Sequence, residues 1–229
     1  MLGSVVTDAV LATSEPMKRS CGSCERCLPA CPTGALIEPG VLDARKCLAY
    51  WLQARGVIPL DLRVAVGDRI YGCDDCIDAC PPGSRLARSS TSPEGNVDLT
   101  ELLMSDDAAL VGSHSHFYIP GRRARYLRRN ALVAAGNTAA DTAIPLLAAY
   151  AGHPDWLLRV HAVWALGRIG GDEAAAVLEH ASSVERDARV TPEVTLALAD
   201  VTTRRADGTA RSTLKVTMRH TVLDSTENL

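Results

Sequence analysis

The chain has 229 residues, of which 47% are hydrophobic, so it is long enough to bury one or two cores. Aromatic residues make up only 4%, and a composition dominated by Ala, Leu and Val favours packed helices over a β-sandwich. The formal net charge of -3 argues against a protein that coats nucleic acid with its whole surface. No apolar stretch reaches the roughly 18 residues that a membrane span needs.

Residues 1–20 precede the first cysteine and are too few to form a domain. Their apolar run is interrupted by Ser14, Glu15 and Pro16. We therefore expect a short helix and a linker, or the remnant of a preceding domain.

The first cysteine motif spans residues 21–32 and reads C-x2-C-x2-C-x3-C-P. This is the spacing of bacterial ferredoxins, in which three thiolates bind one 4Fe-4S cluster and the fourth binds a second cluster. A cube of iron and sulfide needs thiolates that converge from one tight turn. Pro32 then ends the preceding helical turn and directs the chain away.

The second motif is the same pattern with its first cysteine displaced upstream. Cys47 takes that place, and Cys73, Cys76 and Cys80 complete a C-x2-C-x3-C-P sequence. The ferredoxin rule that the last cysteine crosses to the other cluster then divides the ligands of two 4Fe-4S clusters. The first cluster is assigned to Cys21, Cys24, Cys27 and Cys80, and the second to Cys31, Cys47, Cys73 and Cys76.

Other uses of eight cysteines are less consistent with the spacing. Two zinc sites of four cysteines would also use all of them, but a C-x2-C-x2-C triple is poor zinc spacing. Disulfides are disfavoured because eight cysteines in 229 residues are too few for a disulfide scaffold, and the start does not resemble a secretory signal. Reduced thiolates that hold clusters indicate the cytoplasm.

Between the two cysteine motifs, residues 43–53 show a helical pattern that Gly56 would end. Tyr50 and Trp51 lie near the face that carries the displaced cysteine. We interpret both aromatic side chains as packing around the cluster rather than contacting a substrate. The two-cluster module, with a connector rich in Ser, Pro and Gly, is expected to cover residues 21–97.

After the connector the sequence is helical and repetitive. Two short helices are expected within residues 97–110. Residues 127–136 align with residues 158–167 at an offset of 31, and residues 189–194 give a weaker third copy. Each of the first two copies precedes a second helical segment, as in HEAT-like helix pairs, which bury their apolar faces only by stacking. This domain is expected to cover residues 98–201.

The expected fold is therefore mainly α, with a bacterial-ferredoxin-like two-cluster module followed by a short HEAT-like helical-repeat domain. His161 and Trp164 lie in the second copy, where we interpret them as packing residues. From Thr202 the helical pattern fails, so residues 202–229 are expected to form a disordered tail.

Residues 118–130 hold five arginines and no acidic residue. A local basic face on a protein of low net charge is a candidate site for docking phosphates. The alternative is an ordinary solvated helix face. The five candidates are Arg122, Arg123, Arg125, Arg128 and Arg129.

The chain resembles a known family over about residues 2–199, and four stretches carry the resemblance. The first is residues 21–35, which begin with CGSC and end with CPTGA. The others are VLDARKC at 41–47, GDRIYGCDDC at 67–76 and YLRRNAL at 126–132. Together they resemble epoxyqueuosine reductase, the cobalamin- and iron-sulfur-dependent enzyme of queuosine biosynthesis in transfer RNA.

The resemblance implies that the clusters pass electrons to cobalamin, whose reduced cobalt removes the epoxide oxygen from the base at the wobble position. It implies that the five arginines hold the tRNA anticodon stem-loop by its phosphates. It also implies a cobalamin-binding domain ahead of the first motif, which contributes an acidic proton donor. Only residues 2–8 resemble the end of that domain, so no catalytic residue is assigned.

Our working hypothesis is that this chain is the iron-sulfur electron-transfer and tRNA-docking portion of an epoxyqueuosine reductase. An external electron donor is implied, and no membrane partner is expected. Oxidoreductase activity then requires a cobalamin-binding domain, either as a separate polypeptide or because the chain is a fragment of a complete enzyme. The alternative hypothesis is a stand-alone ferredoxin-like electron carrier whose helical repeats bind a protein partner.

Overall fold

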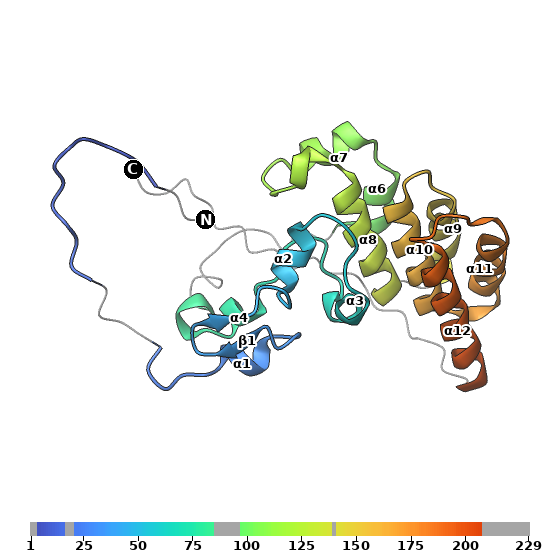
Figure 1. Ribbon diagram of the computed structural model, residues 1–229, viewed down its shortest axis with the longest axis horizontal. Helices are drawn as coiled ribbons and strands as arrows, with labels where there is room; N and C mark the ends of the chain where they lie inside the picture. Colours follow the sequence, from blue (N-terminus) through green and yellow to red (C-terminus); the bar gives the residue numbers. More distant parts are fainter. Residues whose placement is uncertain (1–3, 17–20, 85–96, 139–140, 208–229) are drawn as a thin grey trace.

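The structure is a computed structural model that describes residues 4–16, 21–84, 97–138 and 141–207. A small module built from residues 21–84, the cysteine module, lies beside a stack of longer helices, the repeat domain, formed by residues 97–207 (Figure 1). This confirms the expected mainly α fold with a cysteine-rich module ahead of helical repeats. Within the described residues, no helix is long and apolar enough to cross a membrane.

The cysteine module is made of short elements joined by tight turns. A two-stranded antiparallel sheet, in which Leu36 pairs with Leu42, turns at Gly40, whose φ of 83° favours glycine. Three short helices follow, and the last of them packs against the first helix of the module. In chain order the elements are α1 (Cys27–Ala30), β1 (Leu36–Glu38), β2 (Val41–Leu42), α2 (Leu48–Gln53), α3 (Leu60–Val66) and α4 (Asp75–Asp78).

Two sequence-based expectations for this half of the chain need correction. Residues 4–16 form no regular element, so the short helix expected before the first cysteine does not occur in them. The helix expected over residues 43–53 begins only at Leu48, because Cys47 has an extended backbone with φ -72° and ψ 121°. A residue with this backbone lies just before the helix, so the direction of its side chain is not set by the helical periodicity.

The repeat domain stacks longer helices side by side. The aligned copies lie on α8 and α10, and α10 packs against α8 on one side and α12 on the other (Figure 1). The helix of the third copy continues past Val201, whereas residues 208–229 of the expected tail lie outside the described residues. The elements are α6 (Leu99–Met104), α7 (Asp107–Ser113), η1 (Pro120–Arg122), α8 (Arg125–Thr138), η2 (Asp141–Ala143), α9 (Ile144–Ala151), α10 (Trp156–Ile169), α11 (Gly171–Val184) and α12 (Thr191–Asp207).

Two glycines at equivalent repeat positions set the spacing of these helices. A Cβ atom added to Gly136 on α8 would lie 2.7 Å from the Cα of Ala165 on α10. A Cβ atom added to Gly167 on α10 would lie 2.9 Å from the Cα of Ala197 on α12. Both distances are shorter than van der Waals contact, so only glycine permits this close packing. The 31-residue repeat of the sequence is therefore a repeat of one helix-to-helix contact.

Buried polar contacts join the cysteine module to the repeat domain. His161 on α10 is fully buried, with Nδ1 2.7 Å from the carbonyl oxygen of Leu157. A carbonyl only accepts, so Nδ1 carries the proton, and Nε2 accepts the backbone N–H of Ile58 at 3.2 Å. Trp164 is also buried, at 6% exposure, which confirms both residues as packing residues.

The free energy of unfolding is expected to fall as the pH drops below the usual histidine pKa of 6.5. Burial, together with the charges of Arg63 and Arg129, holds the pKa of His161 well below that value. In this window the unfolded chain binds a proton that the folded protein excludes, at a cost of up to about 1.4 kcal/mol per pH unit. Denaturant titrations between about pH 5 and 7, followed by helical circular dichroism, measure the slope. A His161→Gln variant should have a flatter slope, and equal slopes would contradict this assignment.

Candidate iron-sulfur centre and its neighbouring surface

Four cysteines line one small pocket in the cysteine module. Cys31 follows α1, Cys47 precedes α2, Cys73 precedes α4, and Cys76 lies within α4. The structure thus brings together four thiols from segments far apart in the sequence, and they are the four that the crossing rule assigned to the second cluster. The rest of the lining is mostly apolar, from Pro32, Thr33, Ala35, Leu36, Leu42 and Leu48.

The electrostatics of this pocket suit a cationic ligand. Burial raises the pKa of Cys73 to about 11. Burial and the nearby thiolates of Cys31 and Cys47 also raise the pKa of Cys76. In Cys31 burial is outweighed by backbone hydrogen bonds, one of them from the N–H of Ala35 at 3.2 Å, and the pKa is lowered. Thiolates held this close destabilise one another, and iron ions would supply the positive charge that stabilises all four.

The remaining four cysteines lie around the packed ends of α1 and α4. Cys21 and Cys24 form a turn closed by a 3.1 Å backbone hydrogen bond, and Cys27 begins α1. Cys80 follows α4, its N–H bonded to the carbonyl of Ile77 at 3.0 Å. The grouping of these four around one cluster stays a prediction. Across the described part of the chain, no three Cys, His, Asp or Glu side chains are placed to hold a single metal ion.

Arg129 is the first of the five candidate arginines that the structure reassigns. Its side chain is fully buried, and its guanidinium donates to the carbonyls of Trp51 at 2.9 Å, Ala54 at 2.8 Å and Gly56 at 2.7 Å. These carbonyls lie at and just beyond the end of α2, where a helix leaves acceptors unpaired. Burial lowers the pKa of Arg129 to about 10, so it stays charged at neutral pH. A buried guanidinium cannot reach RNA, and the prediction for Arg129 is wrong.

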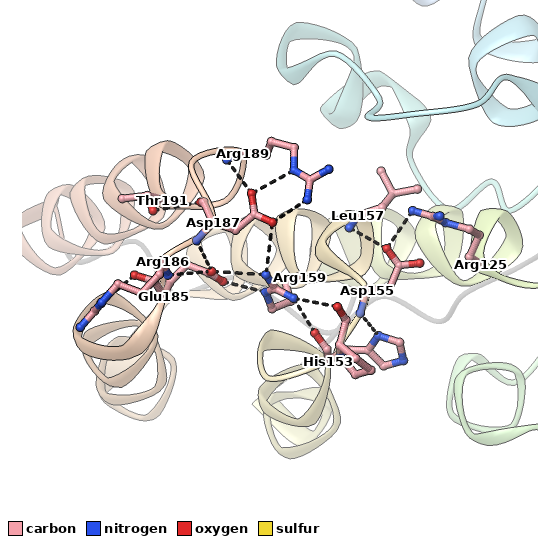
Figure 2. A network of polar contacts seen from close by, with 11 residues as sticks. Arg125, His153, Asp155, Leu157, Arg159, Glu185, Arg186, Asp187, Arg189 and Thr191 are labelled. Carbon is pink, nitrogen blue, oxygen red and sulfur yellow. Dashed lines mark hydrogen bonds and ion pairs between the residues drawn. The ribbon is translucent and has the colours of Figure 1, made fainter.

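Arg128 and Arg125 are engaged within the repeat domain. Arg128 is only 9% exposed and donates to the carbonyl of Ser105 and the carboxylate of Asp107. Arg125 forms an ion pair with Asp155 at 2.8 Å, which Figure 2 shows beside the start of α10. Both arginines therefore connect α8 to neighbouring segments of the repeat domain.

The same arrangement recurs one repeat later. Arg159, at the position equivalent to Arg128, donates to the carbonyl of His153 at 2.8 Å and pairs with Glu185 at 2.7 Å (Figure 2). Asp187 lies 3.7 Å from the same guanidinium and pairs with Arg189 at 2.7 Å. This edge of the stack is thus a row of alternating charges that neutralise one another.

Arg122 and Arg123 are the two candidates that lie on the surface. Arg122 is exposed, although it donates to the carbonyls of Ser115 at 3.1 Å and Val111 at 3.2 Å. Arg123 is exposed, and its side chain makes no hydrogen bond or ion pair with any described residue. The predicted phosphate contacts therefore remain a hypothesis for these two and, to a lesser degree, for Arg125.

The structure also shows an open pocket that the sequence did not indicate, close to α2. Tyr50 is 53% exposed and lines it, so our interpretation of Tyr50 as a packing residue is wrong. Trp51 is partly buried and donates to the carbonyl of Arg45 at 2.6 Å, as expected of a packing residue. Arg55 and Tyr118 also line this pocket. No local pattern in the sequence indicates that Tyr118 lies outside, since its two neighbours are apolar as well.

Comparison with known proteins identifies both halves of the chain. The family of 4Fe-4S double cluster binding domains matches residues 20–83, and the HEAT repeat family matches residues 122–199. The epoxyqueuosine reductase of Bacillus anthracis is 35% identical over 201 residues, which cover 84% of this chain and 53% of that protein. An uncharacterized protein of Geobacillus stearothermophilus is 33% identical over 201 residues, 84% of this chain and 93% of that protein.

Solved structures give the same result. Epoxyqueuosine reductase from Bacillus subtilis superposes with a TM-score of 0.73 at 31% identity, covering 83% of this chain and 53% of that one. A crystal structure of epoxyqueuosine reductase with a tRNA-Tyr epoxyqueuosine-modified stem loop gives a TM-score of 0.72 at 30% identity, with the same coverage. The chain spans about half the length of the curated reductases that it matches. Over this half, in sequence and in fold, the chain belongs to the epoxyqueuosine reductase family.

Proposed function

We propose that this chain is the iron-sulfur electron-transfer and tRNA-docking portion of an epoxyqueuosine reductase. Such an enzyme reduces epoxyqueuosine to queuosine at the wobble position of transfer RNA. The observation that carries the proposal is the eight-cysteine module, four of whose thiols line one pocket, in a chain of this family. The solved relative with a modified tRNA stem loop supports an RNA partner.

In this proposal the eight thiolates bind two 4Fe-4S clusters, grouped as the crossing rule predicts. The N–H of Ala35 donates to the Cys31 sulfur, a contact that stabilises added negative charge and so raises the potential of the second cluster. Leu36, Leu42 and Leu48 cover that pocket with apolar surface and limit the access of water. Electrons enter from an external donor and leave towards cobalamin, which supplies the chemistry that removes the epoxide oxygen.

Cobalamin binding is assigned in this proposal to the half of the curated reductases that this chain does not span. The site of action is the cytoplasm, where transfer RNA is modified. One observation favours the alternative of a stand-alone carrier that binds a protein. Arg125, Arg128 and Arg129 are engaged inside the repeat domain, which leaves a smaller basic face than the sequence indicated. Salt-dependent RNA binding decides between the two functions.

A double variant, Arg122→Ala with Arg123→Ala, should weaken binding of a tRNA anticodon stem-loop and reduce its salt dependence. Both side chains are exposed, so their removal takes away phosphate contacts without opening the core. The slope of log affinity against log salt should fall by roughly 0.7 to 0.9 for each lost contact. Fluorescence titrations at several salt concentrations, with anaerobically reconstituted protein, measure this slope. Adding Arg125→Ala should change little more, because Arg125 is paired with Asp155.

The matched control is the double variant Arg45→Ala with Arg186→Ala. Both are exposed, and Arg186 donates to two backbone carbonyls in the same way as Arg122. The control removes the same charge from other parts of the surface and should leave both affinity and slope nearly unchanged. If both double variants bind RNA as tightly and with the same slope as the parent does, Arg122 and Arg123 are a solvated helix face and the RNA docks elsewhere. A parent that binds no RNA at any salt concentration makes the carrier function the better account.

A further inference from the structure

The open pocket beside α2, which we call the tyrosine pocket, has a volume of about 460 Å³. Its lining comes from the end of α2 with the turn after it, and from the segment that leads into η1 with the first residue of η1. The volume falls in the range of sites that take small ligands. The lining residues are Tyr50, Gln53, Ala54, Arg55, Tyr118 and Pro120, and none of them is acidic.

One wall presents an exposed aromatic ring on a fixed support. Phe117 and Ile119 are each 4% exposed, whereas Tyr118 between them is 64% exposed. The Phe117 ring stacks on the Tyr71 ring with centroids 4.0 Å apart, and the Tyr71 hydroxyl accepts the backbone N–H of Tyr118 at 2.7 Å. The backbone of Tyr118 is thus held on both sides while its ring stays in solvent. Nothing in the core requires an aromatic residue at this position.

The part of the lining that comes from α2 combines a second exposed ring with an unpaired cation. Tyr50 is 53% exposed on α2, and the carbonyls at the end of that helix are held by the buried guanidinium of Arg129. Arg55 is exposed and makes no hydrogen bond or ion pair with any described residue. The wall is therefore rigid, and its one charge is available to a ligand.

Two exposed phenol rings and a free guanidinium suit a nucleotide, because the rings can stack on its flat base and the guanidinium can bind its phosphate. Bases stack on tyrosine, and every base offers such a face, while arginine holds the backbone phosphate. A base in a duplex keeps both faces covered by its neighbours, so the pocket selects an unpaired nucleotide. The two exposed arginines that we propose for RNA docking, Arg122 and Arg123, follow Pro120 in the chain after a single glycine.

We propose that the tyrosine pocket binds one unpaired nucleotide of the docked RNA. Its base stacks on Tyr118 and Tyr50, and its phosphate contacts Arg55. This inference rests on the proposed function and deepens it, because it adds a preference for single-stranded loop nucleotides to phosphate docking. Arg129 then contributes to RNA binding only indirectly, as a positioning residue that fixes the wall carrying Tyr50.

The test uses tRNA anticodon stem-loops with 2-aminopurine at one loop position at a time, and anaerobically reconstituted full-length chain. Stacking quenches 2-aminopurine, so at least one loop position should lose fluorescence when the parent binds. Tyr118→Ala should abolish that quenching and weaken binding about 5- to 150-fold, the range for loss of one stacked base. Tyr118→Phe should preserve both signals, because stacking needs the ring and not the hydroxyl.

Controls separate this pocket from phosphate docking as a whole. Leu196→Ala removes another exposed apolar side chain, on α12, and should have no effect. Arg55→Ala should lower the salt slope, which Tyr118→Ala should not change. A fully paired duplex of the same length should bind the parent more weakly than the stem-loop does.

The possible failures are distinguishable. A parent protein that binds no RNA at any salt concentration overturns the proposed docking function and this inference with it. A parent that binds the stem-loop as tightly as Tyr118→Ala does, or binds duplex and stem-loop equally, overturns the tyrosine pocket alone. In that second case phosphate docking through Arg122 and Arg123 is retained.

Discussion

Replacing Cys80 with Ala should remove the cluster held by Cys21, Cys24 and Cys27, although the first of these lies at the other end of the cysteine module. The crossing rule assigns Cys80 to that cluster, and a cubane that loses one of four thiolates is expected to be lost on purification. The reconstituted parent should contain about eight irons with matching sulfide, and Cys80→Ala about four. Iron and sulfide analysis with electron paramagnetic resonance measures both.

Double variants show which thiols share a cluster, because two lesions in one site remove no more than one does. Cys80→Ala with Cys21→Ala should retain about four irons, whereas Cys80→Ala with Cys73→Ala should retain almost none. Cys31→Ala should behave in the opposite way, losing no further iron when combined with Cys73→Ala. The reverse pattern would show that each motif binds its own cluster. Stoichiometric zinc without sulfide would exclude clusters altogether.

The parts of this molecule that could be predicted from the sequence are those that covalent spacing or periodicity dictates. Four thiols within a few residues of a turn must lie close together, and the ferredoxin rule then groups Cys31 with Cys47 before any fold is known. The structure places these two around one pocket. The repeat offset likewise predicted α8 and α10, and the reason is physical, since Gly136 and Gly167 each permit the next helix to approach.

The arginines show where such reasoning stops. A run of cations predicts a solvated surface, because burying a charge without partners is costly. Here the partners of Arg129 are carbonyls more than 70 residues away in sequence, at Ala54 and Gly56, which no local pattern can indicate. One signal was present, however. Residues 131–136 contain no polar side chain, which is typical of a helix buried on all sides.

Tyr50 and Tyr118 were missed for a related reason. The aromatic content of the chain is only 4%, and a ring is costly to leave in solvent unless a neighbour covers it, which favoured packing as the interpretation of Tyr50, while the sequence assigned no role to Tyr118. Exposure depends on which segments lie next to each other, and here the two rings come from segments separated by the second half of the cysteine module and the start of the repeat domain. The pocket forms only where the cysteine module and the repeat domain lie against each other, because each contributes part of its lining.

Arg129→Ala is expected to cost about 3 to 5 kcal/mol of unfolding free energy, a large share of the stability of an ordinary domain. The change deletes donors to the carbonyls of Trp51, Ala54 and Gly56 and leaves these acceptors buried without partners. It also leaves Asn130, which donates to the carbonyls of Leu52 at 2.8 Å and Ile70 at 2.7 Å, as the main polar contact from α8 to the end of α2, so the turn after α2 should become less well held. Denaturant titrations of the reconstituted protein, followed by circular dichroism and cluster absorbance, measure both effects.

Arg125→Ala is the matched control, because Arg125 lies one turn earlier on α8 and its pair with Asp155 is partly exposed. Its loss should cost no more than about 1 kcal/mol. Arg129→Lys keeps a charge but has a single ammonium in place of the planar group that reaches several carbonyls, so an intermediate loss is expected. A stable Arg129→Ala protein that had lost only RNA binding would restore Arg129 as a phosphate ligand. An unstable one, with Arg125→Ala still stable, identifies Arg129 as a buried structural residue that holds the carbonyls after α2, beside the wall of the tyrosine pocket that carries Tyr50.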